Sequence, residues 1–157
     1  MEIALILAGV LMISRIYAEY LRRGGNELRE FCDFLGKLNL RVAAYLDVGA
    51  DFIKYEDFPS LKRVGFIDAI VGGASFFEGY CACMPRLGIT KSDKKLLYDF
   101  FSEYGRSDMQ TEIRRTEQII SALHIKCEGT RTEIEKKIKV FTSVSLALCL
   151  GVAILII

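Results

Sequence analysis

The chain has 157 residues, the length of a single domain, and its 21 Lys and Arg residues nearly balance its 20 Asp and Glu residues. A net charge of +1 argues against general nucleic-acid binding, because proteins that bind phosphate backbones carry a large basic excess. The 52% hydrophobic content argues against intrinsic disorder. One histidine leaves little material for His-based metal or triad chemistry.

An apolar segment lies at the start of the chain. Residues 3–14 carry no charge, and the segment reaches about 18 residues if it continues through Arg15 to Tyr20 with the arginine snorkelling. We expect a membrane anchor over residues 1–18. The alternatives are a buried core helix and a cleaved signal peptide. Against a signal peptide, only Glu2 precedes the apolar segment, and residues 14–19 form a poor cleavage site.

Helical periodicity follows this segment. The glycine pair 24–25 is expected to break the first helix, and Asn26 to cap the next one. Apolar side chains within residues 28–46 recur with the spacing of an amphipathic helix. Gly49 is expected to end that helix.

Shorter helices are expected in the central part of the chain. Pro59 is well placed to start a helix, and apolar residues keep helical spacing over 60–71 until the glycine pair 72–73. Residues 74–84 predict a short helix that Pro85 stops.

The next predicted helix has its own start and stop signals. Thr90 and Asp93 have the spacing of a capping box, with Asp in the acidic position. Gly105 is expected to end the helix that they begin. No strand-like alternation or internal repeat interrupts this pattern, and the fold class predicted is an all-α antiparallel bundle of about six helices.

The last predicted helix is long. Residues 108–139 would extend about 48 Å as one helix and run directly into the terminal apolar segment. Charged residues fill the positions between its apolar side chains, which is typical of a coiled-coil or bundle seam. Residues 129–130 form the weak point at which this helix could bend or split. The apolar or small side chains recur every seven residues at Ile113, Ile120, Cys127, Ile134 and Phe141.

The final 18 residues, 140–157, carry no charge. As a helix they would span about 27 Å, close to the thickness of a bilayer's hydrocarbon core. We expect a C-terminal transmembrane helix here, with a buried core helix as the alternative.

The positive charges predict an orientation. Basic residues follow the first apolar segment and precede the second, so both clusters lie on the side of residues 19–139. The positive-inside rule therefore places this helical bundle in the cytoplasm, between two anchors in the cell membrane. The residues that carry this prediction are Arg15, Arg22, Arg23, Lys136, Lys137 and Lys139.

The search for chemistry in the sequence finds no strong motif. No nucleotide-binding loop is present, and Glu56 with Asp57 and the lone His124 are better read as solvated or packing residues than as catalytic ones. Five cysteines without a CxxC pair fit reduced thiols, and Cys81 and Cys83 fit buried apolar residues better than a metal site. We therefore expect a protein that is not an enzyme and has no cofactor or metal.

The C-terminal half resembles the stage III sporulation protein AB family of endospore-forming bacteria. The resemblance is carried by residues 92–97 (SDKKLL), by 104–110 (YGRSDMQ) between two helices, by the long charged helix and by the terminal apolar segment. The order of anchor, basic stretch, helical bundle and anchor matches as well.

The resemblance implies a specific role. The family is similar to the cytoplasmic domains of the inner-membrane platform protein of type II secretion and type IV pilus machines, a six-helix antiparallel bundle. It implies a scaffold subunit of the channel between mother cell and forespore, in the mother-cell (outer forespore) membrane, docking a secretion-type ATPase and other channel subunits. Gly105, Arg106, Ser107 and Asp108 become candidates for partner contact, although a turn that only fixes the bundle explains them equally well.

Other functions remain open at this stage. The chain could be a small membrane-anchored helical adaptor unrelated to secretion. Its size and two apolar ends also suggest a holin-like protein, although holins usually have little soluble mass. A homo-oligomer is compatible with all three readings.

Overall fold

The structure of the protein is a computed structural model that describes residues 2–44, 53 and 58–156, with side chains described for 9–10, 12–44, 53, 58–148 and 151. All regular structure in these residues is helical, which confirms the predicted all-α class. Six α-helices and one 3-10 helix are present in this part of the chain. Their bounds are α1 Glu2–Ala43, α2 Pro59–Arg63, α3 Phe66–Val71, α4 Phe76–Cys83, η3 Met84–Arg86, α5 Lys91–Glu103 and α6 Met109–Ile156.

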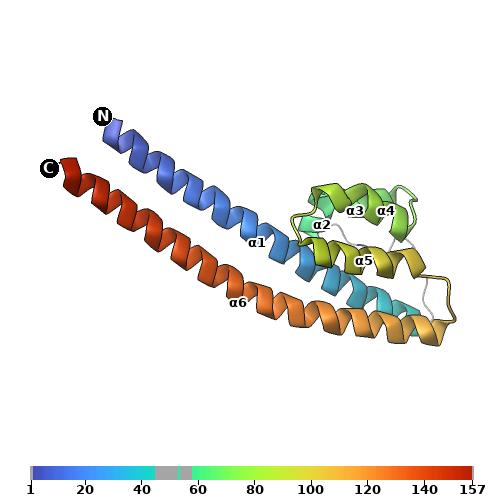
Figure 1. Ribbon diagram of the computed structural model, residues 1–157. Helices are drawn as coiled ribbons and strands as arrows, with labels where there is room; N and C mark the ends of the chain where they lie inside the picture. Colours follow the sequence, from blue (N-terminus) through green and yellow to red (C-terminus); the bar gives the residue numbers. More distant parts are fainter. Residues whose placement is uncertain (1, 45–52, 54–57, 157) are drawn as a thin grey trace.

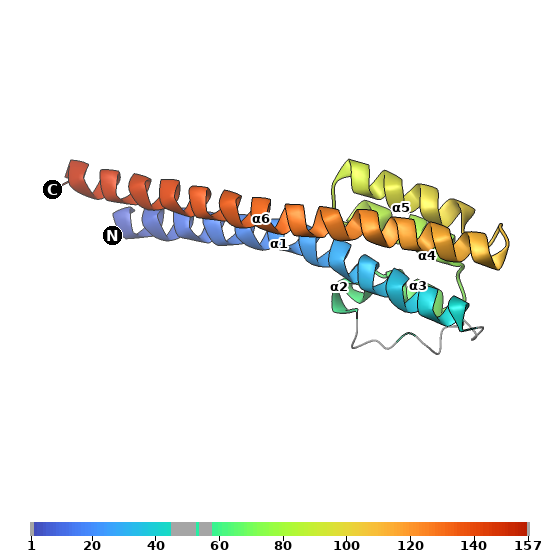
Figure 2. The same ribbon diagram turned by 90° about the horizontal axis from the view of Figure 1, so that it is seen from below.

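Two long helices form the frame of the molecule. α1 and α6 run antiparallel and side by side, so both chain ends lie at the same end of the molecule (Figures 1 and 2). Tyr17 packs on Phe141, with ring centroids 4.9 Å apart. The short helices α2–α5 gather at the opposite end, and we call this part the head. The bundle is uneven, because only α1 and α6 are long.

The predicted helix break at the glycine pair 24–25 is wrong. α1 is continuous from Glu2 to Ala43, so Asn26 lies inside a helix and caps nothing. The glycines serve close packing instead. A Cβ on Gly24 would lie 2.5 Å from the carbonyl oxygen of Gly88, and a Cβ on Gly25 would lie 3.4 Å from Cδ1 of Ile134. The predicted helix end at Gly49 lies outside the described residues.

The predicted helix over residues 60–71 is two short helices. Pro59 occupies the start of α2, as predicted. Gly65 then adopts a left-handed backbone with φ of 88°, which ends one helix and begins α3. The glycine pair 72–73 ends α3, in agreement with the sequence.

A full capping box begins α4, and one half of such a box begins α5. Ser75 caps α4, where its hydroxyl accepts from the Glu78 N–H and the Glu78 carboxylate accepts from the Ser75 N–H; the sequence reading missed this box. Thr90 caps α5 as predicted, accepting from the Asp93 N–H at 3.2 Å. Pro85 lies in η3, directly after α4.

α6 continues through its predicted weak point. The helix is unbroken across Gly129, where the Thr132 hydroxyl donates to the carbonyl oxygens of Glu128 and Gly129. Neither the boundary expected between residues 18 and 19 nor the one between 139 and 140 is marked by a break in α1 or α6.

The core of the head is aromatic. Phe31 and Phe34 on α1 are fully buried, and each makes an edge-on contact with Phe66 of α3. Phe101 of α5 and Tyr80 of α4 complete the cluster, and the Tyr80 hydroxyl donates to the Lys94 carbonyl oxygen at 2.8 Å. The core thus joins α1 to α3, α4 and α5.

Two buried carboxylates on α1 fix the head to the frame. Glu30 accepts from the backbone N–H groups of Ser60 and Leu61, at 2.8 and 3.0 Å, so its side chain caps α2. Glu27 accepts from the Gly88 N–H at 2.6 Å and from Arg23 Nε at 2.9 Å. These contacts satisfy backbone groups that would otherwise be buried without a partner.

Candidate functional site

The turn between α5 and α6 contains all four predicted contact residues. Gly105 takes a left-handed backbone with φ of 81°, a conformation that favours glycine. Its N–H donates to Glu112 Oε1 at 3.2 Å, and the Ser107 N–H donates to the same oxygen at 3.1 Å. Glu112, only 6% exposed, therefore holds the turn closed from the first turn of α6.

Asp108 caps α6. The Thr111 N–H and the Thr111 hydroxyl donate to its two carboxylate oxygens at 3.1 and 2.6 Å. These hydrogen bonds stabilise the charged carboxylate and lower the pKa of Asp108. The Asp108 carbonyl oxygen accepts the Glu112 N–H, which is the first backbone bond into the helix.

Arg106 differs from the other three. Its backbone N–H donates to the Glu103 carbonyl oxygen, but its exposed side chain makes no hydrogen bond or ion pair with any described residue. It lies at the edge of a hollow of about 570 Å³ between α3, α4 and α5. We call this hollow the aromatic hollow; its other lining side chains include Ile70, Phe76, Phe77, Phe101 and Tyr104.

Tyr104 links the turn to the aromatic hollow. Its ring lies 5.7 Å from the ring of Phe76 and 5.5 Å from that of Phe100, measured between centroids. Burial, and secondarily the nearby Glu112 carboxylate, raises the pKa of Tyr104 to about 12, so the phenol stays neutral. The hollow therefore offers an apolar wall with one free guanidinium at its edge.

The four candidates thus divide by role. Gly105, Ser107 and Asp108 make contacts that build the turn, whereas the Arg106 side chain is available to a partner. Sequence reasoning found the turn but missed the hollow. The hollow depends on how three successive α-helices pack, and only the aromatic content of residues 76–77 and 100–104 hinted at it.

Comparison with known proteins settles the family. The sequence model of stage III sporulation protein AB matches residues 73–157, more than half of the chain. The chain belongs to the stage III sporulation protein AB family. Membership implies a role in sporulation. No curated protein and no solved structure matches the chain.

The family match covers the candidate site except for the part of the aromatic hollow that α3 lines. It begins at the left-handed Gly73 and includes α4, α5, the turn at residues 105–108 and all of α6. α1, α2 and α3 lie outside the matched residues, so the family signal resides in the half of the chain that contains the turn and the long C-terminal helix.

Exposed apolar side chains gather away from this site, on the two long helices toward the chain ends. Phe141 and Tyr17 belong to both this group and the pair that joins the helices. Over the part of the chain that the structure describes, no helix meets the length and hydropathy expected of a membrane span. The exposed large side chains in this region are Met12, Ile13, Ile16, Tyr17, Tyr20, Val140, Phe141, Val144, Leu146 and Leu148.

Five of the six basic residues predicted to set the orientation lie between this apolar region and the head, whereas Arg15 lies within the apolar region. Arg23 is the exception to their general exposure, because its Nε donates to the buried Glu27 and its Nη2 to the Arg86 carbonyl oxygen. Lys137 pairs with Glu133 at 2.9 Å, a contact that raises the pKa of Lys137. The exposed members are Arg15, Arg22, Lys136, Lys137 and Lys139.

The cysteines show no arrangement for metal chemistry in the residues that the structure covers. Cys83 is buried, and this burial raises the pKa of its thiol to about 12. Neither it nor Cys81 belongs to a group of three or more His, Cys, Asp or Glu residues there. His124 is exposed and lies 3.8 Å from Glu128.

Proposed function

We propose that the protein is a non-enzymatic membrane platform subunit of the mother cell–forespore channel, which docks a secretion-type ATPase through the α5–α6 turn and the aromatic hollow. The observation that carries the proposal is that the candidate site and the exposed apolar side chains lie at opposite ends of the molecule. The site with Arg106 lies at the head, the exposed apolar side chains lie toward the other end, and two continuous helices join them (Figure 1).

The membrane arrangement is part of this proposal. Residues 1–18 and 140–157 would enter the membrane, and residues 19–139 would form the cytoplasmic domain on the mother-cell side. Three features support it: both chain ends lie together, large apolar side chains are exposed on both helices near them, and basic residues follow on the side of the head. Burying those side chains in lipid would remove exposed apolar surface from water.

The chemistry of the site suggests what a partner must present. A free guanidinium at the edge of an apolar hollow fits a segment that places a carboxylate beside a large apolar side chain. Arginine and aromatic side chains are common in the energetic centre of protein interfaces. The ATPase surface that docks here should therefore carry an acidic residue next to an apolar anchor.

The test is co-purification of the tagged full-length chain from sporulating-cell membranes in mild detergent, with identification of the proteins that accompany it. We expect a secretion-type ATPase with the wild-type chain, and at least a tenfold lower yield with Arg106→Glu, since reversing a buried interfacial charge costs about 2 kcal/mol or more. Lys95→Glu is the matched control. Lys95 is exposed in the N-terminal half of α5, away from the turn, and its reversal should leave the yield unchanged.

The remaining outcomes separate the parts of the proposal. ATPase capture that is equal for wild type and Arg106→Glu would support the platform role and reject the docking site. If no ATPase or channel subunit accompanies a chain recovered from the membrane fraction, the platform role fails and a helical adaptor with another partner takes its place. Recovery of the chain only from the soluble fraction would reject the membrane arrangement.

A further inference from the structure

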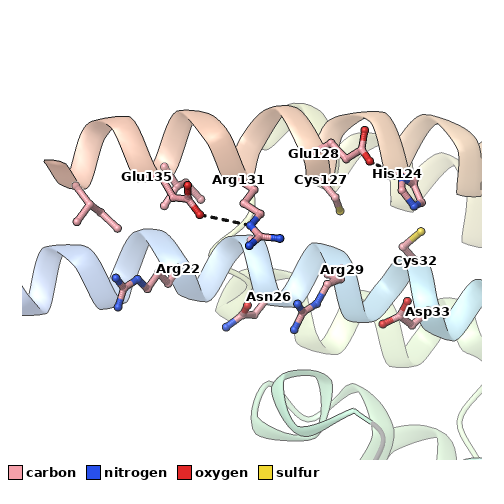
Figure 3. A pocket seen from close by; sticks show the side chains of 13 residues that line it. Arg22, Asn26, Arg29, Cys32, Asp33, His124, Cys127, Glu128, Arg131 and Glu135 are labelled. Carbon is pink, nitrogen blue, oxygen red and sulfur yellow. Dashed lines mark hydrogen bonds and ion pairs between the residues drawn. The ribbon is translucent and has the colours of Figure 1, made fainter. Parts of the chain in front are cut away.

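A groove of about 580 Å³ runs between α1 and α6, outside the site described above (Figure 3). Cys32 and Cys127 point toward one another at its floor. Cys127, Ile134 and Ile138 of this floor are only half-buried, although they belong to or flank the heptad pattern of α6. A heptad seam that is partly open on one side has room for further helices.

Charged and polar side chains border the groove in one row on each helix, and the two rows differ in their ion pairs. The α1 row is Arg22, Asn26, Arg29 and Asp33, and the α6 row is His124, Glu128, Arg131 and Glu135. All eight residues are exposed. The α6 row pairs within itself, whereas the charged residues of the α1 row have no ion-pair partner among the described residues.

The heights of the two rows along the molecule follow from the helix register. Tyr17 lies beside Phe141 and Gly25 beside Ile134, so each step forward on α1 corresponds to one step back on α6. By this register, each residue of the α1 row lies one to two positions, or about 1.5–3 Å along the helix axis, from the matching residue of the α6 row taken in reverse order.

We propose that this groove is the interface of a parallel homodimer, in which two copies meet about a two-fold axis that runs along the long helices. Rotation about such an axis keeps every residue at its own height and sets α1 of one copy against α6 of the other. The chain then forms a four-helix bundle in which the half-buried floor becomes its core.

The charges of the two rows are complementary in this arrangement. Arg22 faces Glu135 of the second copy, and Arg29 faces Glu128 of the second copy. Between and beyond them, the neutral Asn26 faces an arginine and Asp33 faces a histidine. Because the interface is symmetric, each of these pairs forms twice.

The other face-to-face arrangement does not fit a shared membrane. A two-fold axis perpendicular to the helices would set α1 against α1 and α6 against α6, and an axis through the middle of the groove would place Arg22 opposite Asp33 of the second copy, so charge alone does not exclude this arrangement. It would, however, point the chain ends of the two copies in opposite directions, whereas the parallel dimer keeps all four ends at one end, as a shared membrane requires.

The length of the groove limits the expected affinity. From residue 124 to residue 138 it spans about 21 Å, and a face this long and two helices wide is at the small end of stable interfaces. We therefore expect self-association with a dissociation constant in the range of about 1–100 µM.

A charge-swap experiment tests the dimer with the full-length chain in mild detergent. Variant one carries Arg22→Glu and Arg29→Glu, and variant two carries Glu128→Arg and Glu135→Arg. In either variant alone, like charges face each other across the axis, so the dissociation constant should rise at least tenfold. Mixed together, the two variants restore opposite charges on both seams and should dimerise about as well as the wild type.

The readout is sedimentation equilibrium, with copies carrying different tags co-purified from the mixture. The double reversal Arg114→Glu and Glu117→Arg, at exposed positions of α6 outside the groove, is the control and should dimerise normally. Rescue in the mixture also shows that both variants fold. This inference is independent of ATPase docking, because Arg106 is unchanged in every variant.

Three outcomes would overturn it. A wild-type chain that stays monomeric up to about 200 µM has no such interface. Dimers that form equally in both variants use another surface. If each variant loses association and the mixture does not recover it, the second copy does not supply the complementary charges. The same result is expected if the groove binds only a different protein.

Discussion

The backbones of Gly24 on α1 and Gly88 in the segment before α5 meet so closely that a Cβ on Gly24 would lie 2.5 Å from the Gly88 carbonyl oxygen. The same approach lets the Gly88 N–H donate to the buried Glu27 carboxylate at 2.6 Å. One contact between two glycines thus positions the segment that leads into α5 against the frame.

Gly24→Ala should therefore destabilise the protein, although alanine favours helices more than glycine does. The backbone of residue 88 must move away, which we expect to cost about 1–3 kcal/mol and to outweigh the gain of about 1 kcal/mol in helix propensity. Gly36→Ala is the control, because nothing lies within 4 Å of a Cβ there, and it should stabilise by about 0.5–1 kcal/mol. Denaturant unfolding followed by circular dichroism measures both. Equal stabilisation by both substitutions would disprove the close contact.

This contact also explains the main error of the sequence reading. Local propensity treats the pair Gly24–Gly25 as a helix break, because the sequence contains no sign that residue 88 will lie against it. The interpretation of Gly129 as a weak point in α6 has the same origin. Helix propensity costs about 1 kcal/mol for each glycine, and the packing of two long helices exceeds that cost.

Signals that act over a few residues predict the helix ends correctly. The backbone geometry at a helix end is fixed locally by the pair Thr90 and Asp93, by Pro59 and by Gly105. The residue types at these positions are therefore enough to predict the helix ends. The Ser75–Glu78 box was equally local and could have been found by the same rule. The candidate turn was therefore predictable.

The partners of the buried acids were not predictable. Glu30 looks like one more charged residue on an amphipathic helix, yet its carboxylate caps α2 from thirty residues away. The aromatic hollow likewise depends on how α3, α4 and α5 pack, which no single segment of the sequence specifies.

The Glu30 cap leads to a second prediction. Glu30→Ala removes the acceptor of the Ser60 and Leu61 N–H groups, and should cost about 1–3 kcal/mol because buried donors lose their partner. Glu30→Gln keeps one acceptor oxygen and should cost less. Glu117→Ala, at an exposed position of α6, should change the free energy of unfolding by less than about 0.5 kcal/mol. A cost for Glu30→Ala no larger than this control would contradict the capping role.

Acid titration of stability tests the Asp108 cap. Because its pKa is lowered in the folded protein, the charged carboxylate contributes stability that is complete above its ordinary pKa of 3.8 and disappears as the pH falls through the lower, folded value. Asp108→Asn keeps a capping side chain but cannot titrate. The difference in melting temperature between wild type and this variant should therefore shrink below about pH 4. A difference that stays constant from pH 7 to pH 2 would rule out this contribution.

Thiol reactivity provides a fourth prediction. Burial raises the pKa of Cys127 to about 11, so at pH 8 only about one thiol in a thousand is ionised, against about one in four for a free cysteine. In a variant whose other cysteines are replaced by serine, Cys127 should react with iodoacetamide at least 100-fold more slowly than free cysteine at this pH. The rate should still rise about tenfold when the pH is raised from 8 to 9, because the thiolate fraction rises about tenfold for each pH unit while the pH is below the pKa. A rate equal to that of free cysteine would show that the thiol is not shielded.

The unbroken course of α6 has a mechanical consequence. A helix of 48 residues is about 72 Å long, and it begins within the turn that holds Arg106 and Asp108. Such a rod acts as a lever: a tilt of about 5° at the head would carry its far end sideways by about 6 Å. A partner that tilts the head when it binds and releases it would thus move the opposite end of α6 by more than the width of a side chain. No helix would have to unwind.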